Sequence, residues 1–185
     1  MERATRAPVL VTGASGFIAG HLINQLLLKG YKVRATVRSK ETSRYDHLMK
    51  ITNAEKNLEI VEADLTKQSS WESSFADGVE FVFHVAAPVI LKPDDPETVL
   101  MQPSVAGTQN ILDWCQRTAS VKKLIFTSCM SCVSDDFDNN RVYDESDWNT
   151  LSSLTRNSYA YRYSTTCAVN NTHSKTMTIF YFAKC

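Results

Sequence analysis

Short hydrophobic runs alternate with helical patterns along most of the chain. Five of these runs predict buried strands, at Val9–Val11, Tyr31–Val37, Leu58–Glu62, Glu80–Val85 and Lys123–Thr127. Amphipathic helical patterns lie between most of them. Strands that alternate with helices are typical of right-handed βαβ units, so the sequence predicts an α/β fold with a doubly wound parallel sheet.

Two helices are predicted most clearly. The first follows the first strand, with apolar residues at helical spacing and an end at Lys29-Gly30; its apolar positions are Ile18, Leu22, Leu26 and Leu27. The second spans Glu97 to Arg117 and carries Val105, Thr108, Leu112 and Cys115 on one face. Pro103 must lie in the first turns of this second helix or kink it.

The pattern weakens toward the end of the chain. Ser164 to Lys175 is rich in Ser, Thr and Asn with little periodicity, and Met177 to Ala183 is an apolar run that is either a strand or an exposed sticky end. We therefore expect one domain over residues 1–161 and an atypical tail over 162–185 that does not continue the fold. A sheet truncated after about five or six strands leaves an exposed parallel edge after the fifth strand, which favours self-association.

Composition narrows the class of protein. The chain has 185 residues, of which 43% are hydrophobic, and its 20 basic residues balance 20 acidic ones. No global charge favours nucleic acid or a membrane surface, and no leader or membrane-spanning run is evident, so we expect a cytoplasmic protein. Five cysteines at irregular positions predict reduced thiols rather than a disulfide framework.

The first strand leads into a glycine-rich turn that is typical of a dinucleotide phosphate site. Gly13 permits a tight turn, Gly16 lets the backbone approach a pyrophosphate, and the small Ala19 lets the helix pack closely on the strand. The free N–H groups at the start of the helix then face the phosphates. An ordinary strand-turn-helix unit is the alternative.

Residues after the next strands suggest the rest of a cofactor site. Arg38 follows the second strand, where a basic side chain accepts the 2′-phosphate of NADP; a solvated basic strand edge is the alternative. Asp64, after the third strand, could bind the adenine amine or act as a helix cap. The segment 85–88, after the fourth strand, could leave room for the ribose or form a plain turn. His84 is predicted to be a hydrogen-bonded core histidine.

Six sequence blocks, in order, resemble the extended short-chain dehydrogenase/reductases, specifically the dihydroflavonol reductase and cinnamoyl-CoA reductase group. These blocks lie at 11–18, 33–38, 63–65, 82–88, 126–128 and 142–146. The resemblance implies a Rossmann fold, NADP(H) and reduction of a carbonyl on a small organic substrate. It assigns cofactor contacts to Gly13, Ala14, Ser15, Gly16, Phe17, Ile18, Arg38, Asp64, Leu65, Val85, Ala86 and Ala87.

The same resemblance implies a catalytic Ser, Tyr and Lys, and this chain departs from that pattern. Tyr159 matches the tyrosine that donates the proton, but Cys129 takes the place of the serine and Tyr163 that of the lysine. Ser128 could substitute for the serine hydroxyl after a local shift. Arg162 is adjacent to the lysine position, and we expect it to be a poor replacement because neighbouring residues point in different directions.

Three functions follow as alternatives. The first is an NADPH-dependent carbonyl reductase of impaired activity, and the second is a catalytically silent NADP(H)-binding or regulatory fragment. A nucleotide-sugar epimerase or dehydratase shares the fold but usually has an acidic residue where Arg38 stands. The abrupt end of the resemblance after Tyr161 suggests a frame-shifted, alternatively spliced or mispredicted end of a longer reductase. The Cys129-x-x-Cys132 pair suggests redox chemistry or half a zinc site, although a zinc site needs a second pair.

Overall fold

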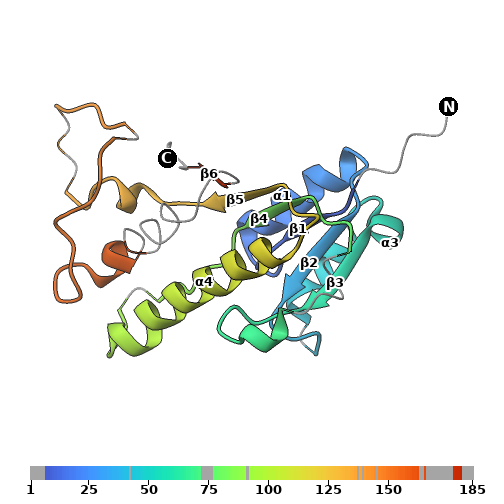
Figure 1. The fold of residues 1–185 in the computed structure, drawn as a ribbon, viewed down its shortest axis with the longest axis horizontal. Coiled ribbons are helices and arrows are strands. Elements are labelled where there is room, and N and C mark those ends of the chain that lie inside the picture. Colours follow the sequence, from blue (N-terminus) through green and yellow to red (C-terminus); the bar gives the residue numbers. More distant parts are fainter. Residues whose placement is uncertain are drawn as a thin grey trace.

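Six parallel strands form one sheet in the computed structural model of this chain, in the order β3-β2-β1-β4-β5-β6 (Figure 1). They are β1 (Val9–Val11), β2 (Val33–Val37), β3 (Leu58–Glu62), β4 (Phe81–His84), β5 (Lys123–Thr127) and β6 (Met177–Phe180). The order of the strands reverses between β1 and β4, and open sheets of this kind bind ligands at the carboxyl ends of the strands near that point. The predicted doubly wound parallel sheet is confirmed.

The structure describes residues 7–41, 43–71, 77–90, 92–136, 138, 140–144, 146–162 and 165, and the backbone of 177–180. The predictions that concern Tyr163 and most of the 162–185 tail lie outside these residues.

Within the described residues, four α-helices and four shorter helical turns with defined bounds lie between the strands. The α-helices are α1 (Phe17–Leu28), α2 (Asp46–Met49), α3 (Ala54–Asn57) and α4 (Gln102–Arg117). The 3₁₀ turns are η1 (Ser43–Tyr45), η2 (Gln68–Ser70) and η5 (Met130–Cys132), and η4 (Glu97–Met101) is a π-helical turn. Residues 158–162 form a further helical turn after the long segment that follows β5 (Figure 1, orange).

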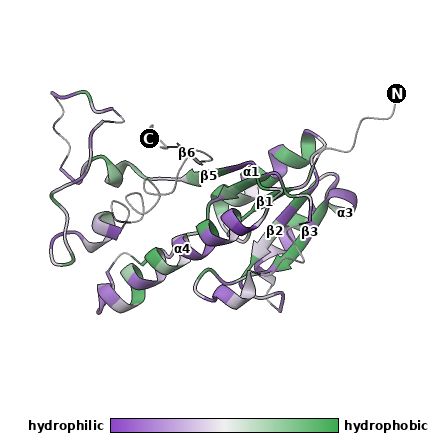
Figure 2. Cartoon of the chain, in the orientation of Figure 1, coloured by the Kyte–Doolittle hydropathy of each residue, from purple (hydrophilic) through white to green (hydrophobic). Residues whose placement is uncertain are grey.

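The two faces of the sheet bury two separate hydrophobic clusters. Alternate residues of β1 contribute to each, since Val9 and Val11 pack with α1 while Leu10 packs with α4. The strands are mostly hydrophobic but carry charged residues such as Arg34 in β2, Glu59 in β3 and Lys123 in β5, and α4 alternates between hydrophobic and hydrophilic positions (Figure 2). The sheet is therefore the middle of three layers, as in other doubly wound folds.

The helix that follows the glycines buries a slightly different face from the predicted one. Its fully buried side chains are Ala19, Ile23, Leu26 and Leu27, while Ile18 is 47% exposed. Ile18 lies in the first turn, beyond the edge of the sheet, so the small Ala19 makes the close contact with the core.

The predicted second helix is divided near Pro103. Residues 97–101 form the π-helical turn η4, and α4 then begins at Gln102 with the proline in its first turn. Proline has no N–H to donate to the carbonyl one turn earlier, so one helical hydrogen bond is missing at Pro103. Because the helix type changes from π to α at Gln102, this missing bond falls where α4 starts. The Ser104 hydroxyl donates to the carbonyl of Leu100 at 2.6 Å and joins the two segments.

The exposed edge predicted after the fifth strand is wrong. β6 pairs with β5 in parallel register, from Leu124 opposite Met177 to Thr127 opposite Phe180, and takes the outer place on that side of the sheet. Thr, Ile and Phe favour strands, which accounts for the pairing of this apolar run. Self-association and the boundary at residue 161 stay predictions.

Gly13 closes the turn between β1 and α1 in a conformation that other residues rarely adopt. Its φ is +72°, and a Cβ atom built on it would lie 2.9 Å from Cα and Cβ of Ala86. The positive φ and the close approach of the segment after β4 both require glycine here.

We predict that Gly13→Ala and Gly20→Ala have opposite effects on stability. Gly13→Ala should lower the free energy of unfolding by about 1–3 kcal/mol through strain and overpacking. Gly20 lies inside α1, where a Cβ would meet its nearest neighbour at 3.5 Å. Alanine at this position should raise the free energy of unfolding by up to about 1 kcal/mol through helix propensity. Urea denaturation of both variants tests this, and equal destabilisation would contradict it.

Candidate functional site

The glycine turn is fixed to the end of β2 by its backbone. The N–H of Ala14 donates to the carbonyl of Thr36 at 2.9 Å, and the N–H of Gly13 donates to the Thr36 hydroxyl at 3.3 Å. A further bond, from the N–H of Gly16 to the carbonyl of Gly13 at 2.9 Å, closes the turn. These contacts hold the start of α1 beside the carboxyl end of β2.

The start of α1 is open to an anion. No side chain caps its first N–H groups, its first turn holds no acidic residue, and Ser15, Gly16 and Phe17 are exposed. Uncapped N–H groups at a helix start carry partial positive charge and bind phosphate. With Gly13 and Gly16 keeping side chains out of the approach, these residues fit the pyrophosphate of a dinucleotide.

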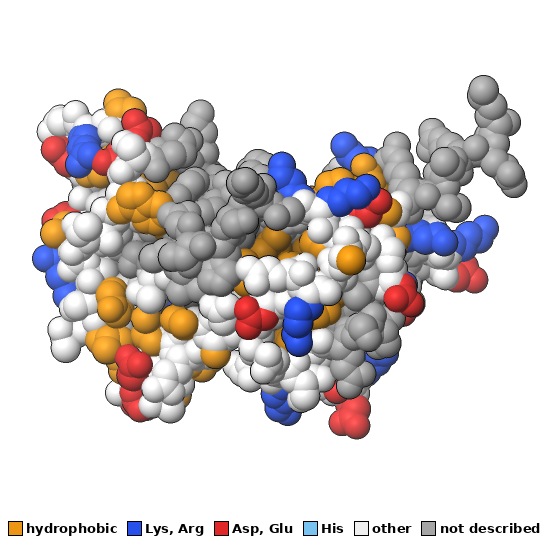
Figure 3. Space-filling view, viewed as in Figure 1, with side chains coloured by type: hydrophobic (Ala, Val, Ile, Leu, Met, Phe, Trp, Pro, Cys, Tyr) orange, Lys and Arg blue, Asp and Glu red, His pale blue; other side chains and the backbone are white. Residues whose placement is uncertain are grey.

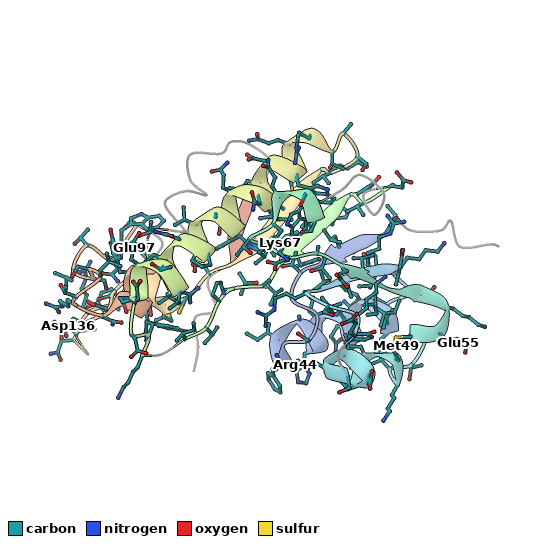
Figure 4. The ribbon with its side chains drawn as sticks, turned by 90° about the horizontal axis from the view of Figure 1, so that it is seen from below. Arg44, Met49, Glu55, Lys67, Glu97 and Asp136 are labelled. Carbon is teal, nitrogen blue, oxygen red and sulfur yellow. The ribbon has the colours of Figure 1, made fainter. Side chains whose placement is uncertain are left out.

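Arg38 lies immediately after β2 and is exposed. It is two residues beyond Thr36, whose carbonyl and hydroxyl hold the glycine turn. Arg34 is placed differently, because it pairs with Glu59 at 2.8 Å and donates to the carbonyl of Asp77 at 2.7 Å. Figure 4 shows Arg44 in the segment beside α1, at the opposite end of the molecule from Glu97 and Asp136. The role of Arg38 as the contact of a 2′-phosphate stays a prediction.

The remaining predicted cofactor residues follow β3 and β4. The Asp64 carboxylate accepts from the N–H and the hydroxyl of Thr66 at 2.9 and 2.8 Å, which is the capping role considered as its alternative. The carbonyl of Leu65 accepts from Asn110 on α4 at 2.7 Å. Val85, Ala86 and Ala87 continue from β4 toward the glycine turn, where Ala86 contacts Gly13.

A buried hydroxyl joins β1 to β4 at this edge of the sheet. Oγ1 of Thr12 accepts from the N–H groups of Val85 at 3.1 Å and Ala86 at 3.0 Å, and lies 2.9 Å from Nδ1 of His84. A hydroxyl has one hydrogen to donate, and the two N–H groups occupy its lone pairs, so Thr12 donates to Nδ1. His84 therefore carries its own hydrogen on Nε2.

His84 is a core histidine, as predicted. It is 3% exposed, and burial lowers the pKa of its imidazole from 6.5 to about 4. The bond from Thr12 to Nδ1 also requires the neutral ring. The threonine partner could not be predicted from the sequence pattern, because the two residues come from separate segments of the chain.

His84 also lines a narrow pocket at the carboxyl ends of β4 and β5. The pocket has room for about one water-sized group, about 10 Å³. Its lining consists of Leu65, His84, Ala86, Ala87, Pro88, Ser104, Thr108, Phe126, Thr127 and Arg162. Three predicted cofactor residues thus meet at one pocket, which also contains Arg162.

Arg162 is the unexpected member of the pocket. It is 1% exposed, its Cζ atom lies 5.1 Å from the centre of the Tyr159 ring, and its Nε and Nη2 atoms are buried without a hydrogen-bond acceptor. The expectation that Arg162 is a poor replacement for the lysine stays a prediction, since Tyr163 lies outside the described residues. The contact with Tyr159 was not predicted; residues three apart share one face of a helical turn, and 158–162 is helical.

Cys129 and Ser128 both follow β5. The Ser128 hydroxyl is buried and donates to Sγ of Cys132 at 3.1 Å, while Sγ of Cys129 lies 3.6 Å from the Ser131 hydroxyl at the start of η5. The bond to Cys132 uses the one hydrogen that Ser128 has to donate. The catalytic roles of Cys129, Ser128 and Tyr159 stay predictions.

The described residues hold no cluster of three or more His, Cys, Asp or Glu side chains that could bind a metal ion.

Cys115 lies on α4, where burial raises the pKa of its thiol to about 12. Within the same residues no helix is long and apolar enough to cross a membrane. Basic and acidic side chains are intermixed over the face shown in Figure 3.

Comparison with known proteins identifies the family. The sequence profile described as the NAD dependent epimerase/dehydratase family matches residues 9–178, from β1 into β6. The chain belongs to this family. It is 39% identical over 152 residues to the dihydroflavonol 4-reductase of Gerbera hybrida, and 38% identical over 171 residues to tetraketide alpha-pyrone reductase 1 of Arabidopsis thaliana. The resemblance drawn from the six sequence blocks is confirmed.

A solved structure of the family has the same fold. Gre2 from Candida albicans, in complex with NADPH, superposes with a TM-score of 0.79 at 29% identity, over 95% of this chain and 56% of that one. The two plant relatives match 82% and 91% of this chain, which spans 41% and 52% of their lengths. The chain thus spans about half the length of the family members that it matches.

We predict that His84 makes stability depend on pH. Since its folded pKa of about 4 lies below the ordinary 6.5, unfolded chains bind a proton between these values that the folded protein does not. The stability is fully present above 6.5 and is lost as pH falls toward 4, by about 3 kcal/mol. Urea denaturation across this range should show a smaller decrease in His84→Asn, which has no imidazole to titrate. The same decrease in both proteins would exclude His84 as its source.

Proposed function

We propose that this chain is the cofactor-binding part of an NADPH-dependent reductase that acts on a carbonyl of a small organic substrate. The observation that carries the proposal is the uncapped start of α1 behind Gly13 and Gly16, with Arg38 exposed beside it. The names of the two plant relatives and the NADPH complex of Gre2 support it.

The residues for binding NADPH come from three strand ends. The N–H groups at the start of α1 would hold the pyrophosphate, and the Arg38 guanidinium would pair with the 2′-phosphate. The small side chains of Ala86 and Ala87 leave space for the nicotinamide half beside the pocket. In the proposed site Asp64 shapes the loop around the adenine through its bonds to Thr66.

The proposed proton donor is Tyr159. When bound, NADPH supplies the hydride that a carbonyl carbon accepts. The Tyr159 hydroxyl would donate the proton that the carbonyl oxygen takes up, and Cys129 would lie near that oxygen. A thiol is a weaker donor than a hydroxyl, so this chain should be a slow catalyst compared with a relative that has serine there.

We predict that Arg38 sets the preference for NADPH over NADH. Arg38→Ala should weaken NADPH binding about 10- to 100-fold, because a charged hydrogen bond to phosphate is lost, and should leave NADH binding nearly unchanged. Nucleotide fluorescence titration measures both affinities.

Arg34→Ala is the matched control, since Arg34 lies on β2, shortly before Arg38, but is paired with Glu59. It should leave the ratio of the two affinities unchanged. Tighter binding of NADH than of NADPH by the unaltered chain would overturn the cofactor assignment.

We predict that Tyr159→Phe abolishes turnover without weakening NADPH binding. The variant keeps the ring that contacts Arg162 and lacks only the hydroxyl that would donate the proton. Carbonyl-dependent NADPH oxidation should therefore fall by about 10²–10⁴-fold. A dihydroflavonol and an aromatic aldehyde serve as test substrates. If the unaltered chain binds NADPH and oxidises it with neither, the chain is a silent NADPH-binding protein and the reductase proposal fails.

A further inference from the structure

Two cysteines lie at the ends of the turn that follows β5. The N–H of Cys132 donates to the carbonyl of Cys129 at 2.9 Å, and this bond closes the turn over η5. Such a turn brings its first and fourth Cα atoms within about 7 Å of each other, and disulfides usually join Cα atoms about 4.4–6.8 Å apart. The backbone therefore places the two cysteines at a separation that a disulfide can span.

The side chains of the two cysteines belong to one small hydrophobic cluster. Cys132 and Phe126 are buried in this cluster, and Cys129 packs against it. Both cysteines are thiols in this structure. Because Cys129 is partly exposed and Cys132 is fully buried, a reagent in solution reaches the Cys129 thiol first.

A neighbouring segment holds the turn in this shape. The N–H of Asn149 donates to the carbonyl of Cys132 at 2.8 Å, and Nδ2 of Asn149 donates to the carbonyl of Ser131 at 2.8 Å. The Asn149 side chain is fixed in turn, since its Oδ1 accepts from the N–H groups of Leu151 and Ser152 at 3.1 Å. Two groups that are held close in this way react with each other much faster than two separate molecules do.

We propose that Cys129 and Cys132 are a redox site, at which a small-molecule disulfide oxidises the two thiols to an intramolecular disulfide. The Cys129 thiolate attacks one sulfur of the small disulfide, forms a mixed disulfide with it and releases one small thiolate. The sulfur of Cys132 then attacks Sγ of Cys129, which forms the protein disulfide and releases the second small thiolate. The two protein thiols give their protons to the released thiolates and two electrons to the small disulfide.

The second step requires one side-chain rotation. Sγ of Cys132 accepts from the Ser128 hydroxyl at 3.1 Å in the dithiol form, and it must turn away from Ser128 to reach Cys129. The backbone bond between the two cysteines can stay in place, because the rotation is about the Cα–Cβ bond of Cys132.

The disulfide removes the one hydrogen that the Cys129 thiol has to donate. Its effect on catalysis rests on the proposed function, in which Cys129 lies near the carbonyl oxygen of the substrate, whereas formation of the disulfide does not. Oxidation should lower carbonyl-dependent NADPH oxidation about tenfold or more, since a donor to that oxygen is lost. NADPH binding should be unchanged, because Gly13, Gly16 and Arg38 are not part of the turn.

Peptide mapping of the unaltered full chain tests the site directly. The chain is equilibrated with mixtures of glutathione and glutathione disulfide, quenched with acid, unfolded, alkylated at its thiols and digested with trypsin. Trypsin cuts after Lys123 and Arg141, so one peptide, 124–141, carries Cys129, Cys132 and no other cysteine. In oxidising mixtures this peptide should lack both alkyl groups and two hydrogens, and dithiothreitol should restore its alkylation. Alkylation of both cysteines in every mixture, or a disulfide from either one to a cysteine outside this peptide, would overturn the proposal.

Cys132→Ser removes the second thiol and should stop the reaction at its first step. Cys129 of this variant should carry glutathione in the same oxidising mixtures. Cys115→Ser is the control, because Cys115 lies on α4 and burial raises the pKa of its thiol to about 12. This control should form the disulfide within 124–141 to the same extent as the unaltered chain, and loss of that disulfide would count against the proposal.

Reductase assays on the reduced and oxidised forms of the unaltered chain test the effect on catalysis. Equal turnover by the two forms would show that the disulfide leaves the reaction site intact and would overturn the inhibitory role. Failure of the proposed function is distinct, since it appears as absent turnover by the reduced form while peptide mapping still reports the disulfide.

Discussion

The Thr12 hydroxyl is the contact on which the architecture of this edge depends. It accepts two N–H groups from the segment after β4 and donates to His84, so three hydrogen bonds meet at one buried oxygen. Through these bonds the Thr12 oxygen holds Ala86 against Gly13. It thereby sets the distance between the carboxyl ends of β1 and β4. Buried polar groups are costly unless they are fully satisfied, and a satisfied group specifies one arrangement of its neighbours.

The glycine turn at the start of α1 and the pocket that Arg162 lines both lie next to this contact. Gly13 belongs to the turn that opens α1, whereas Ala86 and His84 line the pocket. A ligand that spans both places would follow the crevice where the strand order reverses, the usual binding position in open parallel sheets. One buried threonine thus connects the geometry of the uncapped start of α1 with that of the pocket.

Strands and helices could be predicted from the sequence, because they depend on the local pattern of residues. Contacts between segments that are distant in sequence could not. Runs such as Leu58–Glu62 and Lys123–Thr127 became strands with the expected bounds, because they are short and rich in residues such as Ile, Val, Phe and Thr that favour strands. The place of Arg38 followed from the strand order. The bond between Thr12 and His84 could not be predicted, since hydrogen-bond partners on separate strands leave no signal in spacing.

Two contacts between segments were not anticipated. Arg162 was compared only with the residue beside it, whereas a helical turn places it with Tyr159. The edge of β5 was expected to be open because the apolar run from Met177 was predicted as either a strand or an exposed end, and the structure pairs it with β5. In both cases contacts between segments decided what the local pattern left open.

The position of β1 at the centre of the sheet also constrains the order in which the chain can fold during synthesis. β1 is made first, yet its neighbours are β2 and the much later β4, so its pairing cannot be complete until the chain has passed His84. The outer pair forms later still, since Leu124 must wait until Met177 has been made. Parallel pairing over such separations is slow, and a nascent chain would expose the hydrophobic edges of β1 and then β5 in turn, which makes both strands natural points of chaperone contact.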